Sequence, residues 1–86
     1  MKYAAERPFA DPDTAARKLI EIANSAEAYM DGRIPIEVIN GPFLRAGGSP
    51  SEYGAGLALA LANGWLWRHE SGVYVKFTSA GAELFA

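Results

Sequence analysis

The sequence predicts a small α+β fold, with helices in the first two thirds of the chain and a β-hairpin followed by a short helix at its end. Apolar side chains recur at helical spacing from residue 12 to residue 30. Residues 73–77 instead alternate in polarity, which is typical of a half-buried strand. Gly64 separates the two regions and favours the end of a helix, because glycine readily adopts the left-handed conformation found at helix exits.

The length and composition indicate one small soluble domain. Eighty-six residues suffice for a single domain over residues 11–86, with residues 1–10 as an N-terminal arm. A core of this size is limited, so dimerisation would stabilise it. The net charge of −2 is unlike that of a protein whose whole surface attracts nucleic acid. No apolar stretch is long enough to span a membrane and no secretory signal follows Lys2, so we expect a cytoplasmic protein without a membrane partner.

The first helix has a clear start. Asp11 can cap it, Pro12 suits the first helical position, and Asp13 lies near the positive end of the helix dipole. We expect the helix to reach Met30. Its apolar side chains share one face, and they are Ala15, Ala16, Leu19, Ile22, Ala23, Ala26 and Met30. Such a stripe suits either a partner groove or the protein core, and the core is the commoner case.

A short edge strand and a second helix follow. Pro35 lacks the amide hydrogen that a central strand needs, so residues 33–36 predict an edge strand of two or three residues. The second helix is expected from Glu37 to about Arg45. The segment Asn40-Gly41-Pro42 interrupts its pattern, which predicts a kinked or broken helix.

A third helix is expected over residues 50–63, after a cap at Ser49. With Leu57 facing the core, the opposite face carries mostly small or polar side chains, namely Ser51, Glu52, Ala55, Gly56, Leu59, Ala62 and Asn63. A glycine inside a helix costs about 1 kcal/mol relative to alanine. Gly54 and Gly56 therefore suggest the close approach of another group.

The hairpin contains two tryptophans. Trp65 and Trp67 alternate with Leu66 ahead of a turn at residues 70–72. Not all three side chains fit into the core of a small hairpin, so we expect one tryptophan to cover the core and the other to be exposed. An exposed ring there suits stacking, wedging or dimerisation, although core packing is the commoner role. Thr78 then caps the closing helix.

This order of elements resembles the winged helix-turn-helix family, of the kind found in MarR-like and PadR-like bacterial regulators. The likeness rests on residues 57–66, where the third helix leads into the hairpin. It rests also on residues 74–84, where a second wing strand precedes a threonine-capped turn with a glycine three residues on. The resemblance implies three helices, a β-hairpin wing, a short edge strand and a short C-terminal helix over residues 11–86. It further implies a homodimeric transcriptional regulator that binds double-stranded DNA.

In that family the third helix usually enters the major groove and the wing lies along the phosphates or the minor groove. The resemblance thereby implies DNA contacts from Arg45, Ser49, Ser51, Arg68, His69 and Lys76. On the third helix, Glu52, Ala55, Gly56 and Leu59 would also face DNA. The chain departs from the family here, because that helix offers only Asn63 among the side chains that usually read base edges. Residues 33–76 hold four basic and three acidic side chains, a net charge of +1.

An alternative role is a winged helix used for protein–protein interaction or dimerisation, without DNA binding. It rests on the interaction face formed by Ala55, Gly56, Leu59 and Ala62, which would let another helix approach closely. Both roles remain open at this point.

The sequence gives little support to an enzyme, a cofactor or a metal site. His69 is the only histidine and lies beside the hairpin turn, and the chain has no cysteine. The run Gly54-Ala55-Gly56 lacks the third glycine and the preceding strand of a dinucleotide-binding loop. Residues 47–49 suit either an anion site at a helix start or a plain turn, and we favour the turn.

Overall fold

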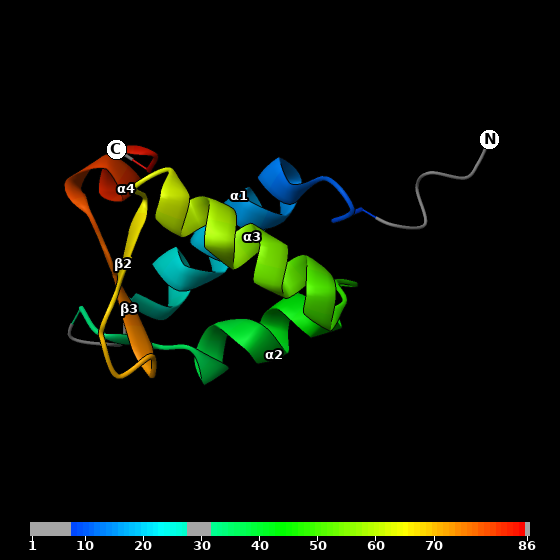
Figure 1. The fold of residues 1–86 in the computed structure, drawn as a ribbon, viewed down its shortest axis with the longest axis horizontal. Coiled ribbons are helices and arrows are strands. Elements are labelled where there is room, and N and C mark those ends of the chain that lie inside the picture. The colour runs from blue at the N-terminus through cyan, green and yellow to red at the C-terminus, as the bar shows by residue number, and fades with distance from the viewer. Residues whose placement is uncertain (1–7, 28–31, 86) are drawn as a thin grey trace.

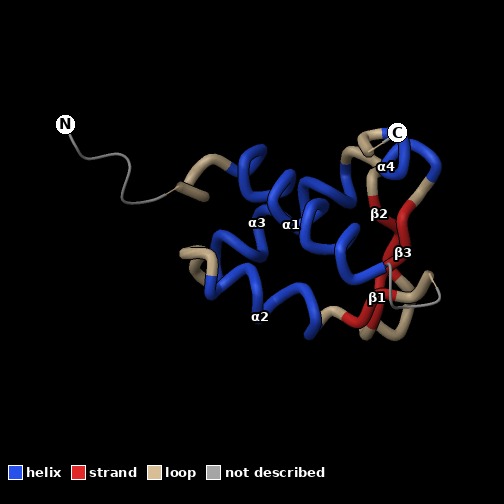
Figure 2. Tube along the Cα trace, turned by 180° about the vertical axis from the view of Figure 1, so that it is seen from behind, coloured by secondary structure: helices blue, strands red, loops and turns tan. Residues whose placement is uncertain are grey.

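The computed structural model describes residues 8–27 and 32–85. Their order of elements is α1 (Pro12–Glu27), β1 (Ile34–Pro35), α2 (Glu37–Arg45), α3 (Pro50–Ala62), β2 (Leu66–Arg68), β3 (Tyr74–Phe77) and α4 (Ser79–Glu83). Figure 1 shows α1, α2 and α3 together on one side of the strands, with α4 at one end of the sheet, and Figure 2 shows the same arrangement from behind. The predicted α+β class is confirmed.

The three strands form an antiparallel sheet in the order β1-β3-β2. The central strand, β3, pairs Val75 with Ile34 of β1, and it pairs Phe77 with Leu66 of β2. Pro35 lies in the edge strand β1, where a missing donor is tolerated. The predicted edge strand and hairpin are therefore confirmed.

The core lies between the helices and the inner face of the sheet. Its buried apolar side chains are Phe9, Ala15, Ala16, Leu19, Ile20, Ala23, Ile34, Ile39, Phe43, Leu57, Ala60, Leu66 and Val75. The core face predicted for α1 is largely confirmed, although Ile20 was not expected and Ile22 and Ala26 lie at its edge. Met30 lies outside the described residues. In the N-terminal arm, Phe9 packs against Phe43 with ring centroids 4.9 Å apart.

Helix α3 crosses α1 at very short range through Gly56. A Cβ atom on Gly56 would lie 2.9 Å from the Cβ of Ala15 and 3.0 Å from its carbonyl carbon. Only a glycine fits this contact without displacing the backbone of α1. The outward orientation predicted for Gly56 is therefore wrong. Leu59 is likewise partly buried against the core. The observed outer face of α3 is therefore rotated about the helix axis relative to the predicted one.

Glu52, in the first turn of α3, is buried. Ser49 Oγ accepts a hydrogen bond from the Glu52 amide at 3.2 Å, and Glu52 Oε1 accepts one from the Ser49 amide at 3.0 Å. This capping box satisfies two helix-terminal amides, and Glu52 is 7% exposed. The prediction that Glu52 faces DNA is wrong for this reason.

The sequence predicts a kinked or broken helix here, and the structure excludes the break, because α2 continues through Pro42. Proline removes one amide donor and crowds the carbonyl one turn earlier, which here belongs to Val38. The flanking turns hold the helix because Ile39 and Phe43 are fully buried. Packing has outweighed the local preference for a break.

Thr78 and Gly81 fix α4 against the junction between α3 and β2. Thr78 Oγ1 accepts a hydrogen bond from the Gly81 amide at 3.0 Å and donates one to the Gly64 carbonyl. A Cβ atom on Gly81 would collide with the carbonyl oxygen of Trp65. The predicted threonine cap is confirmed, and the hairpin is tied to the end of α3.

The two internal glycines of α3 provide a matched pair of substitutions. Gly54→Ala should raise the free energy of unfolding by about 0.5–1 kcal/mol, because a Cβ there meets no atom within 4 Å and alanine favours the helix. Gly56→Ala should lower it by about 1–2 kcal/mol, because the new methyl group overpacks the contact with Ala15. Urea denaturation measures both changes. Equal stabilisation by the two substitutions would contradict the close packing of α1 and α3.

Candidate nucleic-acid interface

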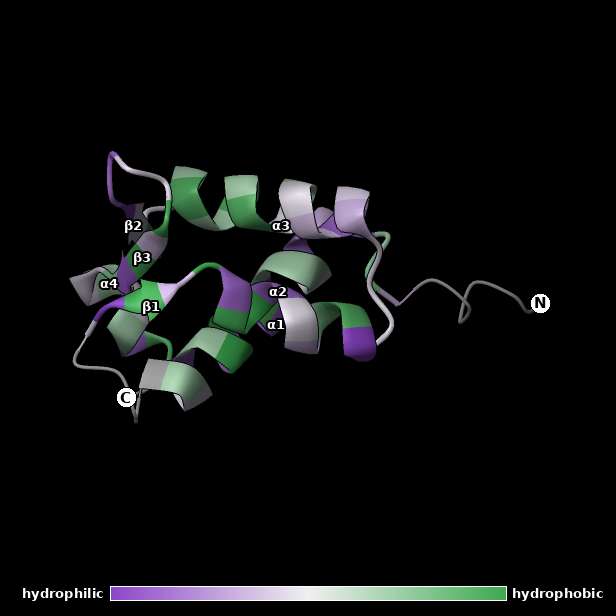
Figure 3. Ribbon diagram, turned by 90° about the horizontal axis from the view of Figure 1, so that it is seen from below, coloured by the Kyte–Doolittle hydropathy of each residue, from purple (hydrophilic) through white to green (hydrophobic). Residues whose placement is uncertain are grey.

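The exposed face of α3 carries no charged side chain. Its exposed residues after the first position are Ser51, Gly54, Ala55, Ala58 and Ala62. Figure 3 shows the C-terminal half of α3 as hydrophobic and only its first turn as mildly hydrophilic. The face is therefore smooth and neutral. It permits a close approach by a large partner but offers few groups for specific hydrogen bonds.

The turn before α3 has no free amides for an anion. The Gly47 amide donates to the Leu44 carbonyl at 3.1 Å, and the Gly48 amide donates to the Phe43 carbonyl at 3.1 Å. The Ser49 amide donates to Glu52. Ser49 thus serves as a helix cap, and the segment acts as a plain turn.

The hairpin presents two faces with different side chains. Leu66 and Val75 are buried, and they mark the inner face, towards the helices. Arg68 pairs with Val75 and therefore belongs to that side, whereas Trp67 pairs with Lys76 on the outer face. The His69 amide donates to the Tyr74 carbonyl at 3.0 Å, which extends the same alternation and places His69 on the outer face.

Arg68 lies close to α3. Its Nη2 atom is 3.7 Å from the position that a Cβ atom on Gly72 would occupy, at the hairpin turn. Burial raises the pKa of Tyr53, on α3, and the positive charge of Arg68 partly opposes this rise. The Tyr53 hydroxyl is buried and has no hydrogen-bond partner within residues 8–27 and 32–85. These observations place the Arg68 guanidinium beside the hairpin turn, on the side of the sheet from which its charge acts on Tyr53 of α3.

The six residues implied as DNA contacts do not form one set. Arg45 is exposed in the last turn of α2, Ser51 is exposed in the first turn of α3, and Arg68 is on the inner side of the hairpin. Ser49 is occupied in the capping box. His69 and Lys76 belong to the outer face. The structure therefore separates a surface around α3 from a second surface on the far side of the sheet.

The structure also changes which residues make up the interaction face predicted as an alternative. Ala55 and Ala62 are exposed as expected, but Gly56 and Leu59 turn inward. Gly54 and Ala58 take their places on the exposed side. The alternation of side chains along the hairpin indicates that Trp67 and Tyr74 are neighbours, whereas nothing in the sequence indicates that the charge of Arg68 acts on Tyr53.

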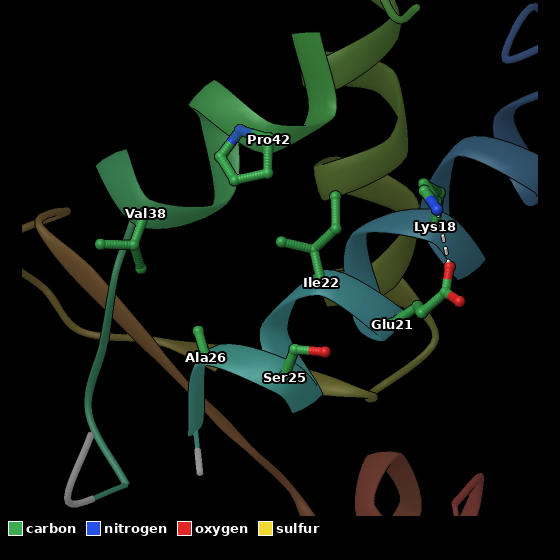
Figure 4. A pocket seen from close by; sticks show the side chains of 7 residues that line it. All are labelled: Lys18, Glu21, Ile22, Ser25, Ala26, Val38 and Pro42. Carbon is green, nitrogen blue, oxygen red and sulfur yellow. Dashed lines mark hydrogen bonds and ion pairs between the residues drawn. The ribbon is translucent and has the colours of Figure 1, made fainter. Parts of the chain in front are cut away.

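A hollow of about 460 Å³ lies between α1 and α2. Figure 4 shows Ile22, Ala26, Val38 and Pro42 around it. Lys18 and Glu21 lie at its rim and pair with each other at 3.0 Å. No pair of groups suited to acid–base or nucleophilic chemistry converges among the residues drawn there.

Neither a metal-binding cluster nor a membrane-spanning helix occurs in the described part of the chain. No group of three or more His, Asp or Glu side chains in residues 8–27 and 32–85 is arranged to hold a metal ion. Over those same residues, each helix is too short or too polar to cross a membrane.

Comparisons with known proteins give no relative. The sequence matches no protein-family model and no curated protein, and no solved structure matches the fold.

The buried phenol of Tyr53 predicts an alkaline loss of stability. Because burial raises its pKa above the ordinary value of 10.0, the unfolded chain releases this proton first as the pH rises. The free energy of unfolding should then fall progressively above about pH 10. Tyr53→Phe should reduce that fall and, by removing an unpartnered hydroxyl, leave stability at neutral pH unchanged or higher. Urea denaturation between pH 7 and pH 11 tests this, and an identical fall in both proteins would contradict it.

Proposed function

We propose that this chain is a winged-helix protein that binds double-stranded DNA and acts as a transcriptional regulator, with α3 as the helix that enters the major groove. The observation that carries the proposal is the order α2, turn, α3, hairpin, combined with the sheet order β1-β3-β2. In this arrangement the hairpin returns beside α3, as a wing does. The proposed role is binding, without catalysis or a cofactor.

The electrostatics of the α3 surface support a polyanionic partner. Glu52, the only acidic residue of α3, is buried, so the exposed helix face carries no charge that would repel phosphate. Arg45 lies at the end of α2, before the turn that leads into α3. Arg68 lies on the hairpin, on the side that faces the helices. Neither arginine has a carboxylate partner among the described ion pairs, which leaves both available to neutralise phosphates.

The same surface supports limited sequence discrimination. Side chains that read base edges are usually Arg, Lys, Asn or Gln, and the exposed face of α3 offers only Ser51 and, at its end, Asn63. Small side chains allow the helix backbone to approach the groove closely. The proposed binding therefore depends mainly on phosphate contacts and on the shape of the duplex.

Charge reversal on the two faces of the hairpin tests the DNA proposal. With a labelled 20-base-pair duplex at about 50 mM salt, Arg68→Glu should weaken binding about tenfold and reduce the salt dependence by about one ion. Lys76→Glu makes the same charge change on the outer face and should have a smaller effect. Fluorescence anisotropy measures both. The proposal fails if micromolar wild-type protein binds no duplex in a salt-sensitive manner.

A second candidate is a winged helix that associates with another protein or with a second copy through α3. The observation that favours it is Gly54, which is exposed and for which a Cβ atom meets no neighbour within 4 Å. Glycine at this position lowers helix stability by about 1 kcal/mol relative to alanine, and no close contact within the domain requires it. Together with Ala58 and Ala62 it forms an exposed stripe of small residues one helical turn apart, against which another helix can pack closely.

The second candidate predicts that a charge on α3 disrupts association in the absence of DNA. Ala58→Glu is suited to this test because Ala58 is exposed, whereas Leu59 packs against the core. Sedimentation velocity should show a dimer for the wild type and a monomer for Ala58→Glu. Asn24→Glu adds the same charge on the exposed side of α1 and should leave the dimer intact. A monomeric wild type at about 100 µM would rule out self-association through α3.

A further inference from the structure

The outer face of the β-hairpin holds a compact group of aromatic side chains. Trp67, His69 and Tyr74 share this face by the strand register, and we call them the aromatic cluster. Trp67 is 48% exposed, an unusual degree for the largest apolar side chain in so small a domain. Figure 2 shows α1, α2 and α3 on the other side of the strands, so these helices do not cover the cluster.

The rings are held in a fixed arrangement before any partner binds. His69 and Tyr74 stack with centroids 4.6 Å apart and an interplanar angle of 19°. Trp67 stands edge-on to both rings, at 5.8 Å from His69 and 6.4 Å from Tyr74. The Ser71 amide donates to His69 Nδ1 at 3.1 Å, which fixes the imidazole. Ordering these rings on binding therefore costs little conformational entropy.

One cation, Lys76, lies beside the cluster. Lys76 lies directly opposite Trp67 in the sheet, is exposed and has no ion pair among the described residues. Glu70 directly follows His69 but lies in the hairpin turn, outside the two strands that carry Trp67 and Lys76. A partner for this face thus needs flat, stackable groups and negative charge on the same molecule.

From this combination we propose that the outer face of the hairpin binds single-stranded nucleic acid, with unpaired bases stacking on the aromatic cluster and a phosphate bound by Lys76. Exposed aromatic rings beside cations on a β-sheet suit unpaired bases, whose faces are accessible for stacking. In an intact duplex those faces are occupied by neighbouring base pairs. The proposal goes beyond duplex binding by α3, and it uses residues on the opposite side of the sheet.

The test measures binding of a fluorescein-labelled 12-nucleotide oligothymidine, and of the corresponding oligouridine, by anisotropy at about 50 mM salt. Trp67→Ala should weaken binding about tenfold, in line with the loss of one stacked base. Lys76→Glu should weaken it by a similar factor. Trp67→Phe retains a ring and should preserve most of the affinity. It should also remove the quenching of Trp67 fluorescence that a stacked base is expected to cause in the wild type. Val73→Ala, which shortens another exposed apolar side chain of the hairpin (62% exposed), should have no effect.

Three results would overturn the inference. The first is no binding of either oligonucleotide by micromolar wild-type protein, and the second is binding that Trp67→Ala leaves unchanged. The third is a wild-type dimer that Trp67→Ala converts to a monomer, since the cluster would then be a self-association surface. Arg68→Glu separates this inference from the duplex proposal, because it should weaken duplex binding and spare the oligonucleotide. Preference for either DNA or RNA supports the inference and identifies the type of strand.

Discussion

The contact between Gly56 and the backbone of α1 is the constraint on which the rest of this domain depends. A side chain at this position would push α3 away from α1. Because the two helices cross closely only where Gly56 faces α1, the contact determines the rotation of α3 about its own axis. That rotation buries Leu57 and Ala60 and turns Glu52 inward. It leaves a neutral face of small residues outside. The charge and shape of the proposed DNA surface follow from this one contact.

Contacts at the C-terminal end of α3 fix the position of the hairpin. Thr78 bonds the Gly64 carbonyl at the end of α3, and Gly81 packs on the Trp65 carbonyl. These contacts hold the three-stranded sheet across the ends of the helices, so that its two faces have different surroundings. Arg68 lies towards α3, whereas the aromatic cluster and Lys76 face away. One small sheet thereby provides two chemically distinct surfaces.

The sequence predicts the elements well because capping residues and strand alternation are local signals. Asp11, Ser49 and Thr78 all act at helix starts as expected. The orientation of α3 was not predictable, because alanine and glycine occur all around this helix and mark no apolar side. The aromatic cluster was predictable only as one exposed tryptophan. Its stacking depends on the register that brings His69 opposite Tyr74, and the sequence alone does not specify that register.

The most direct test of the two-surface account is to follow the backbone amide resonances of ¹⁵N-labelled protein during titration with a DNA duplex, and separately with a single strand. The account predicts duplex shifts at Ser51, Ala55, Ala58 and Arg68, and single-strand shifts at Trp67, His69 and Lys76. Shifts centred on the hollow between α1 and α2, or the same residues responding to both ligands, would contradict it.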